Sequence, residues 1–423
     1  MFLYNLAITT YSLIVRIAAN NSDKAKLWCE GRVDIFERMS SAIDPEDRVI
    51  WIHVASLGEF EQGRPIIERI REEHPEYKIL LTFFSPSGYE VRKNYTGADY
   101  IFYLPIDTTR NARRFLDIAH PEIAIFVKYE YWLNLLFELR KRKIRSYIVS
   151  AIFRRNSIFF KSWGAMWRRA LVSFETLFVQ DHASQKMLAE LGFDNVVVAG
   201  DTRFDRVISI AKGARTIPEI EWFKGESRAL VAGSTWQPDE DLLLKLAENH
   251  KDIKFIFAPH EIGESRVKEL IQRAGGETRS KAGARAVRYT EVMRLSEEAQ
   301  RERLNEAQIL VVDTIGMLSS LYKYGDFGYI GGGFGVGIHN TLEAAVFGLP
   351  LAFGTNYQRF KEANDLIALG ACRSISNAEE LEAWFSALQG DTDLYTKAAR
   401  TAKHYTTNMS GATQLITQTI FCE

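Results

Sequence analysis

Residues 49–65 read VIWIHVASLGEFEQGRP, and this stretch decides the fold class. The apolar run Val49–Val54 predicts a strand that is buried on both faces. Gly58 lets the backbone turn tightly after that strand, and Pro65–Glu73 predicts a helix. A buried strand that leads into a helix is the unit from which helix-covered parallel sheets are built.

The same alternation of strands and helices continues along the chain. Further helices are expected at Ser184–Leu191 and Glu240–Ala247. Further strands are expected at Ile79–Phe84, Tyr100–Tyr103, Ile123–Val127, Tyr147–Ile152, Thr176–Val179, Val196–Ala199, Ala229–Ala232, Phe255–Ala258, Ala286–Tyr289, Ile309–Val312, Phe327–Ile330 and Leu351–Phe353. About fourteen strands exceed one comfortable open sheet. We therefore expect an α/β protein with two Rossmann-like lobes.

The lobe boundary is expected within Thr202–Trp222. The predicted domains are an N-terminal segment (1–20), a first Rossmann-like domain (21–205), a second one (206–395) and a C-terminal helical segment (396–423). We expect the C-terminal helical segment to pack back on the N-terminal domain.

Composition excludes several classes of protein. The 423 residues include 53 Lys and Arg and 54 Asp and Glu, so the net charge of −1 argues against a generally basic nucleic-acid binder. Cys29, Cys372 and Cys422 are far apart, which argues against a disulfide framework and a structural zinc site. Metalloprotease, serine-hydrolase and strand-following D-x-D motifs are absent.

The first twenty residues, MFLYNLAITTYSLIVRIAAN, carry a single charge, Arg16. A helix over Phe2–Ala19 is about 27 Å long, barely the thickness of a hydrocarbon core of about 30 Å. Several polar residues make it a poor spanning segment. We favour a membrane anchor or interfacial helix over a buried helix, and the basic residues that follow keep the body cytoplasmic.

Ligands of open α/β sheets bind beyond the carboxyl ends of the strands. Glu59 follows the strand Val49–Val54, where a carboxylate can act as a general base. The alternative is that it only favours a helix N-terminus. Residues 331–345, GGGFGVGIHNTLEAA, follow Phe327–Ile330. Their glycines and the helix start favour an anion, and Glu343 is placed to accept bonds from ribose hydroxyls; a plain glycine-rich loop is the alternative.

A third signal is the charge run Arg140–Arg169, with ten basic residues, six aromatic residues and no acid. Exposed aromatics with basic charge suit single-stranded nucleic acid or an anionic membrane; a solvated face is the alternative. We favour a membrane surface and a phosphorylated lipid. Arg203, at the lobe boundary, offers a guanidinium for a phosphate.

Four motifs resemble the 3-deoxy-D-manno-octulosonic acid (Kdo) transferases of lipid A. They are W-C-E-G-R (28–32), H-V-A-S-L-G-E-F-E-Q (53–62), G-S-T-W (233–236) and H-N-T-L-E-A-A (339–345). The resemblance implies a GT-B fold, with a cleft between an acceptor-binding first lobe and a CMP-Kdo-binding second lobe. It also implies that the protein is located at the cytoplasmic face of the inner membrane of a Gram-negative-type bacterium.

The resemblance carries site roles onto matching positions. Glu59 matches the general base. The donor-binding positions are Arg203, Ser234, Pro259, His260, Ile315, Gly316, Met317, Asn340, Thr341, Leu342 and Glu343. The acceptor-side candidates are Ser56, Gly58, Glu130, Arg154 and Arg155. His260 stands where the family often has arginine, and Lys128 and Tyr129 depart from a Glu-Thr-Glu pattern.

The implied reaction is inverting transfer of Kdo from CMP-Kdo to a tetraacyl disaccharide bisphosphate precursor of lipid A. CMP-Kdo is a co-substrate with one phosphate, and neither a cofactor nor a metal is expected. The alternatives are another GT-B enzyme, such as a lipid A disaccharide synthase or a nucleotide-sugar epimerase, and a non-catalytic membrane-bound nucleotide-binding scaffold.

Overall fold

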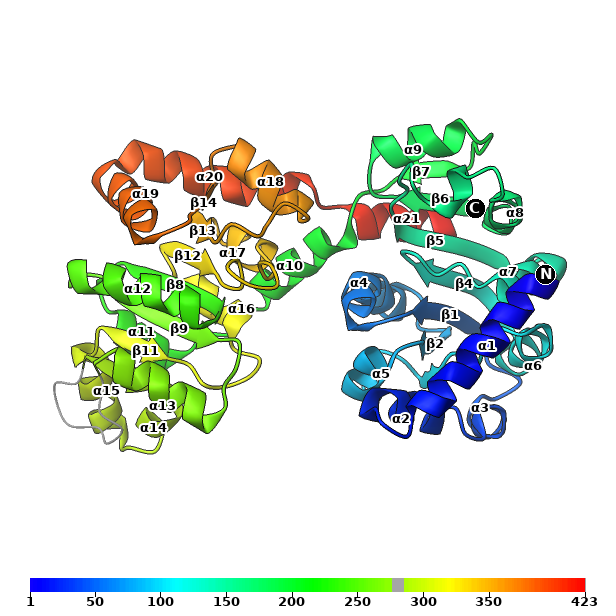
Figure 1. Cartoon of the computed structure of the whole chain (residues 1–423), viewed down its shortest axis with the longest axis horizontal. Helices are drawn as coiled ribbons and strands as arrows, with labels where there is room; N and C mark the ends of the chain where they lie inside the picture. Colours follow the sequence, from blue (N-terminus) through cyan, green and yellow to red (C-terminus); the bar gives the residue numbers. More distant parts are fainter. Residues whose placement is uncertain (276–284, 423) are drawn as a thin grey trace. The chain divides into compact units, whose positions relative to one another are not determined.

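The computed structural model describes residues 1–275 and 285–422, which form two compact units (Figure 1). Unit 1 comprises Met1–Arg206 and the segment that begins at Met409, and unit 2 comprises Val207–Asn408. The C-terminal region therefore divides at Asn408 and not at residue 395. Helix α20 (Thr392–Asn408) belongs to unit 2, and α21 (Ala412–Phe421) belongs to unit 1.

Unit 1 is built on a sheet of seven parallel strands in the order β3-β2-β1-β4-β5-β6-β7. The strands are β1 (Val49–Val54), β2 (Lys78–Phe83), β3 (Tyr100–Tyr103), β4 (Pro121–Val127), β5 (Arg145–Ala151), β6 (Thr176–Val179) and β7 (Val196–Val198). The helices that precede, connect or follow them are α1 (Phe2–Ala18), α2 (Asp23–Glu30), α3 (Ile35–Ala42), α4 (Leu57–Glu73), α5 (Pro86–Arg92), α6 (Thr109–Ala119), α7 (Leu133–Lys141), α8 (Ala165–Leu171), α9 (His182–Ala189) and α10 (Thr202–Lys212).

Unit 2 repeats this architecture with the strand order β10-β11-β9-β8-β12-β13-β14. Its strands are β8 (Ala229–Thr235), β9 (Lys254–Pro259), β10 (Ala286–Arg288), β11 (Ile309–Val311), β12 (Phe327–Ile330), β13 (Leu351–Phe353) and β14 (Cys372–Ser374). Its helices are α11 (Pro218–Lys224), α12 (Gln237–Asn249), α13 (Glu264–Arg273), α14 (Tyr289–Val292), α15 (Glu297–Glu306), α16 (Leu318–Leu321), α17 (Leu342–Ala345), α18 (Lys361–Ala368), α19 (Ala378–Gly390) and α20.

The prediction of two parallel α/β lobes is confirmed, and all the expected strands form. Strand β14 was missed because three residues with the sequence Cys-Arg-Ser carry no strand pattern. Helix α4 begins at Leu57, so the predicted start at Pro65 is wrong. Pro65 lies inside the helix, where it removes one backbone donor.

Each sheet has one topological switch point, where successive strands along the chain stop being added at one side of the sheet and start being added at the other. In unit 1 this point lies between β1 and β4, and in unit 2 it lies between β8 and β12. At such switch points the loops after the two strands diverge and leave a crevice beyond their carboxyl ends. The loops after β1, β4, β8 and β12 are therefore the places where ligands are expected.

Helix α1 forms as predicted, but it is not a buried helix. Ser12 is its only buried residue, while Phe2, Leu3 and Ile17 are 79%, 76% and 63% exposed. Within the described part of the chain, none of the helices has both the length and the apolar character that a membrane crossing requires.

The aromatic residues of Arg140–Arg169 are mostly core residues, which corrects their interpretation as an exposed set. Tyr147, Phe153 and Phe159 are buried, and only Trp163 is largely exposed, at 69%. Four of the ten basic residues form ion pairs with acids outside the run, namely Lys141, Arg142, Arg145 and Arg155. The run itself contains no acid, and the ion-pair partners lie from three residues (Glu138) to thirty-five residues (Glu190) away in the chain, so the pattern within the run did not reveal them.

Asp205 on α10 attaches helix α21 to unit 1. Its carboxylate accepts bonds from the backbone N–H of Gly411 (2.6 Å) and Thr413 (2.8 Å) and from the Thr413 hydroxyl (2.8 Å). The first N–H groups of a helix have no partner within the helix, so this carboxylate acts as an N-terminal cap supplied from another element.

We expect Asp205→Ala to loosen α21 selectively. Loss of a helix cap costs about 0.5–2 kcal/mol, so amides of Ala412–Phe421 should exchange with deuterium up to about thirtyfold faster. Hydrogen-exchange mass spectrometry provides the measurement, and Asp205→Asn, which keeps an acceptor oxygen, is the control. Unchanged exchange of α21 in the alanine variant would contradict the capping role.

Candidate functional site

Glu59 lies on the first turn of α4, directly beyond the carboxyl end of β1. Its Oε2 accepts a 2.5 Å hydrogen bond from the backbone N–H of Ala55, so it does favour the start of the helix. The pKa of Glu59 is nevertheless raised to about 7, first by burial and then by the charge of Glu130. A carboxylate with such a pKa is suited to accept a proton near neutral pH.

Glu130 lies in the loop after β4, on the other side of the unit 1 switch point. It is 8% exposed, and its Oε2 lies 3.1 Å from Nε2 of the fully buried His53. Trp132 Nε1 donates to the same oxygen at 2.7 Å. His53 is held in turn by Thr82, whose Oγ1 lies 2.9 Å from Nδ1. This polar chain fixes the position of the charge that raises the pKa of Glu59.

Lys128 begins the loop that carries Glu130, and its backbone is strained. Its φ of 69° lies in the left-handed region that non-glycine residues rarely occupy. Its charge lowers the pKa of Glu59, in opposition to Glu130. Such strain is commonly found at functional sites because the surrounding structure must hold it in place.

The other acceptor-side candidates differ in their surroundings. Ser56 and Gly58 flank the start of α4, and Gly58 is exposed with no neighbour that a methyl group would crowd. Burial raises the pKa of Tyr129, and the charge of the exposed Arg154 opposes this rise, which places that charge close to the Glu130 loop. Arg155 forms a two-bond ion pair with Glu190 and is therefore already engaged.

In unit 2, Ser234 lies at the carboxyl end of β8 and is strained like Lys128, with a φ of 54°. Its backbone touches the glycine-rich loop, because a Cβ added to Gly331 would lie 2.2 Å from the Ser234 carbonyl oxygen. Gly333 meets Gly354 in the same way, at 2.6 Å. These glycines are thus required for close approach within the protein, whatever the loop binds.

The glycine-rich loop uses several of its own N–H groups. Those of Gly335 and Gly337 donate to the carbonyl of Gly332, and that of Gly332 donates to Asp239 Oδ2 at 3.0 Å. The Leu342 N–H is taken by Asn340 Oδ1 at 3.0 Å. The amides of these four residues are therefore committed and are not available to an anion at this edge.

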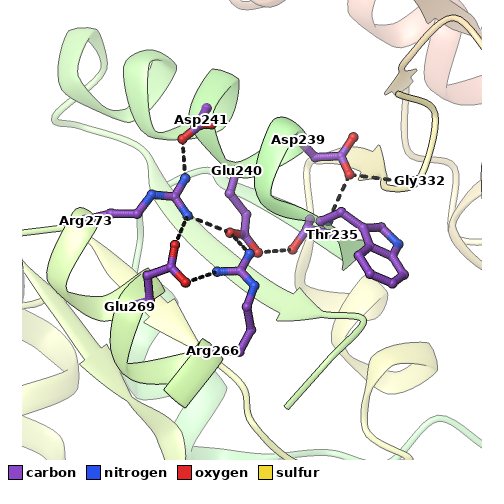
Figure 2. Close-up of polar contacts among 9 residues, drawn as sticks. Thr235, Asp239, Glu240, Asp241, Arg266, Glu269, Arg273 and Gly332 are labelled. Atoms are coloured by element: carbon purple, nitrogen blue, oxygen red, sulfur yellow. Dashed lines mark hydrogen bonds and ion pairs between the residues drawn. The ribbon is translucent and has the colours of Figure 1, made fainter. Parts of the chain in front are cut away.

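Two adjacent acids on α12 hold the edge of the unit 2 sheet together (Figure 2). Asp239 also accepts from Trp236 N–H and Tyr329 hydroxyl, both at 2.9 Å. Glu240 is fully buried and accepts from Thr235 at 3.2 Å and from Arg266 and Arg273. The ends of β8 and β12 are positioned by these bonds, and breaking such a buried network is costly.

The remaining donor-side candidates follow three strands of the same sheet. Pro259 and His260 end β9, Ile315–Met317 follow β11, and Asn340–Glu343 form the start of α17 after β12. Ile315 is 89% exposed, whereas Thr341 and Leu342 are buried. Asn340 Nδ2 donates to Glu343 Oε1 at 2.9 Å, so these two candidates are in contact.

Arg203 belongs to unit 1, whereas the other donor-side candidates belong to unit 2. Its Nε donates to Asp201 Oδ2 at 2.8 Å, and its backbone N–H donates to the same carboxylate. Asp201 is buried at 5% exposure and also accepts from Gln62. The role of Arg203 toward a phosphate is still a prediction.

The described residues contain no group of three or more His, Cys, Asp or Glu side chains that could hold a metal ion. That a reaction here needs no metal or cofactor is still a prediction. Sequence reasoning assigned no role to His53 or to the Asp239 and Glu240 pair. The signal for His53 was present, since a histidine in an otherwise apolar buried strand needs a polar partner.

We expect Glu130→Gln to lower the pKa of Glu59 from about 7 toward 4.5 because it removes a nearby negative charge. The carboxyl ¹³C shift of Glu59, followed by NMR during a pH titration, reports this change. Glu122→Gln, at the opposite end of β4, is the control. An unchanged Glu59 midpoint would show that Glu130 does not act on it.

Comparison with known proteins supports one family. A family model described as 3-deoxy-D-manno-octulosonic-acid transferase (kdotransferase) matches residues 32–206. The 3-deoxy-D-manno-octulosonic acid transferase of Aquifex aeolicus (strain VF5) is 26% identical over 340 residues, or 78% of this chain and 83% of that protein. The enzyme of the same name from Haemophilus influenzae is 23% identical over 92% of this chain and 90% of its own length.

Among solved structures, the UDP-GlcNAc 2-epimerase from Neisseria meningitidis, bound to UDP-GlcNAc, is similar with a TM-score of 0.58. The two sequences are 14% identical, and the structural match spans 89% of this chain and 100% of the epimerase chain. At this identity the similarity concerns the fold alone, which is the GT-B architecture of two Rossmann-like units. The family match to residues 32–206 and the curated relatives, which align with most of the chain, agree with the motifs read from the sequence, so the chain is similar to the Kdo transferases over most of its length.

Proposed function

We propose that this protein transfers Kdo from CMP-Kdo to a tetraacyl disaccharide bisphosphate precursor of lipid A, with inversion at the anomeric carbon. The observation that carries the proposal is Glu59, a carboxylate with a pKa near 7 at the switch point of a Kdo transferase domain. Epimerases share only the fold, and the family match favours transfer over the alternatives.

In the proposed reaction Glu59 removes the proton from the acceptor hydroxyl as its oxygen attacks the anomeric carbon of Kdo. Because the pKa of Glu59 is about 7, the carboxylate form that accepts the proton increases as the pH rises through 7. Glu130, held by His53 and Trp132, supports this role by keeping Glu59 basic. CMP leaves with its phosphate stabilised by side-chain donors of unit 2.

The proposed acceptor is a lipid, and unit 1 has a surface that suits an anionic membrane. The exposed apolar side of α1 includes Phe2, Leu3, Leu6, Leu13, Ile14 and Ile17. The N-terminal end of α1 touches α8 of the basic run, since Tyr4 packs edge-to-face on Trp167 at 6.1 Å. Apolar and basic features are therefore adjacent, as in peripheral helices that lie in a membrane interface.

Incubation with CMP-Kdo and tetraacyl lipid A precursor should give a Kdo-bearing lipid by mass spectrometry, and Glu59→Gln should reduce its rate by about 10²–10⁴-fold. Binding of CMP should persist in the variant because the nucleotide is assigned to the other unit. Glu72→Gln, exposed near the end of the same helix, is the control. If a folded Glu59→Gln variant keeps more than a tenth of the wild-type turnover, Glu59 is not the general base.

The double change Leu3→Ser and Leu6→Ser should weaken sedimentation with anionic phospholipid vesicles by at least about tenfold, because burying one leucine contributes about 1.5–3 kcal/mol. A matched control replaces Leu369 and Leu394 of unit 2, which are 52% and 41% exposed. Equal vesicle binding by both double variants would show that α1 does not contact the membrane.

A further inference from the structure

Three aromatic rings form a column at the edge of the unit 2 sheet. The rings of Trp236 and His260 are stacked with centroids 4.6 Å apart, at 24°. His260 and His339 are stacked in the same way at 4.7 Å and 28°. Trp236 follows β8, His260 follows β9 and His339 follows β12, so the column lies across the switch point of this sheet.

The column is lined by polar atoms without partners. Trp236 Nε1 and His339 Nε2 are buried and make no hydrogen bond, and Thr341 Oγ1, two residues after His339, is in the same state. Thr341 is 1% exposed. Unpaired buried polar atoms are rare and costly. Three of them at one sheet edge indicate a polar ligand that pairs with them when bound.

The character of these groups indicates the charge of that ligand. The indole N–H is only a donor, a hydroxyl can donate, and an imidazole donates from both nitrogens once it is protonated. Several of the neighbouring loop amides, including those of Gly332, Gly335 and Gly337, are committed to internal bonds. A protonated histidine of the column therefore adds a positive charge and a second donor at this edge.

We propose that Trp236, His260 and His339 bind the phosphodiester anion of the nucleotide donor, and that the histidine pair takes up a proton from solvent as it binds. This inference rests on the proposed function for the nature of the donor. His260 is exposed and lies against the indole face of Trp236. The two stacked imidazoles oppose double protonation, and the anion relieves that repulsion.

Other charged or titratable groups on the surrounding elements are Asp239, Glu240, Glu261, Tyr322, Glu343 and Arg359. Asp239 and Glu240 are saturated by the bonds described above, and Glu343 contacts Asn340. Arg359 donates to the Val336 carbonyl. Burial and the charge of His260 hold the pKa of His339 below its usual value, so without ligand this histidine is neutral near pH 7.

The sign of the pH effect follows from this arrangement. A bound anion favours the protonated pair and raises its pKa, so affinity is greatest at low pH and declines as the pH rises toward 8. Uptake of one proton changes Kd by up to about tenfold for each pH unit. We expect at least about a fivefold weaker Kd at pH 8.0 than at pH 5.5.

The test is isothermal titration calorimetry of the full chain with the methyl ester of CMP. This phosphodiester does not titrate near neutrality, whereas CMP itself does, with a pKa of about 6. Titrations at pH 6.5 in two buffers of different ionisation enthalpy should reveal uptake of a substantial fraction of a proton. No uptake together with a Kd that does not change from pH 5.5 to 8.0 would overturn the proposal, as would absence of binding at pH 5.5.

Substitutions of His260 and His339 test which group takes up the proton when the ester binds. His260→Arg supplies a permanent charge, so it should bind the ester with a Kd that changes less than about twofold over the same pH range. His339→Gln should lose affinity at low pH. His182→Gln, on α9 of unit 1, is the control and should behave like the wild type. Full proton uptake in both column variants would place the proton elsewhere and refute the assignment.

Calorimetry also separates this inference from the proposed function. A protein that transfers Kdo but binds the ester without proton uptake refutes only the histidine column. A protein that binds the ester with proton uptake but transfers no Kdo keeps the anion site and refutes the proposed reaction.

Discussion

All strands in each sheet run parallel, and this constraint determines where polar chemistry can occur. Strands such as β1 and β8 are covered on both faces, so nearly all their side chains are apolar or paired. Polar residues that follow the strands are then collected at one edge. Glu59 and Glu130 meet at the switch point of one sheet, and Trp236, His260 and His339 meet at that of the other.

Two carboxylates close together at a partly desolvated edge are unfavourable unless one is held by other groups. In unit 1 the buried His53 and the Trp132 indole hold Glu130, and the resulting repulsion acts on Glu59. Glu130 is fixed by its partners, whereas Glu59 can gain or lose a proton near neutral pH, which is what a general base requires.

Different interactions position the strand-following loops in the two units. Unit 1 relies on the His53 chain and on strain at Lys128. Unit 2 relies on glycines that permit direct backbone contact and on the buried acids Asp239 and Glu240. The glycine-rich loop is therefore part of the scaffold at this edge of the sheet. Several of its amides are already used in internal bonds.

The sequence by itself determined most of the strands, the two-lobed class and the candidate loops, because buried parallel strands are apolar runs and the turns after them carry polar residues. Its motifs also indicated the family. Only the tertiary structure paired Glu59 with Glu130, stacked His260 between Trp236 and His339, and placed α21 on unit 1 through Asp205. It also showed that most aromatics of Arg140–Arg169 belong to the core. The physical reason is that strand order and register bring distant residues together, and a local pattern carries no information about either.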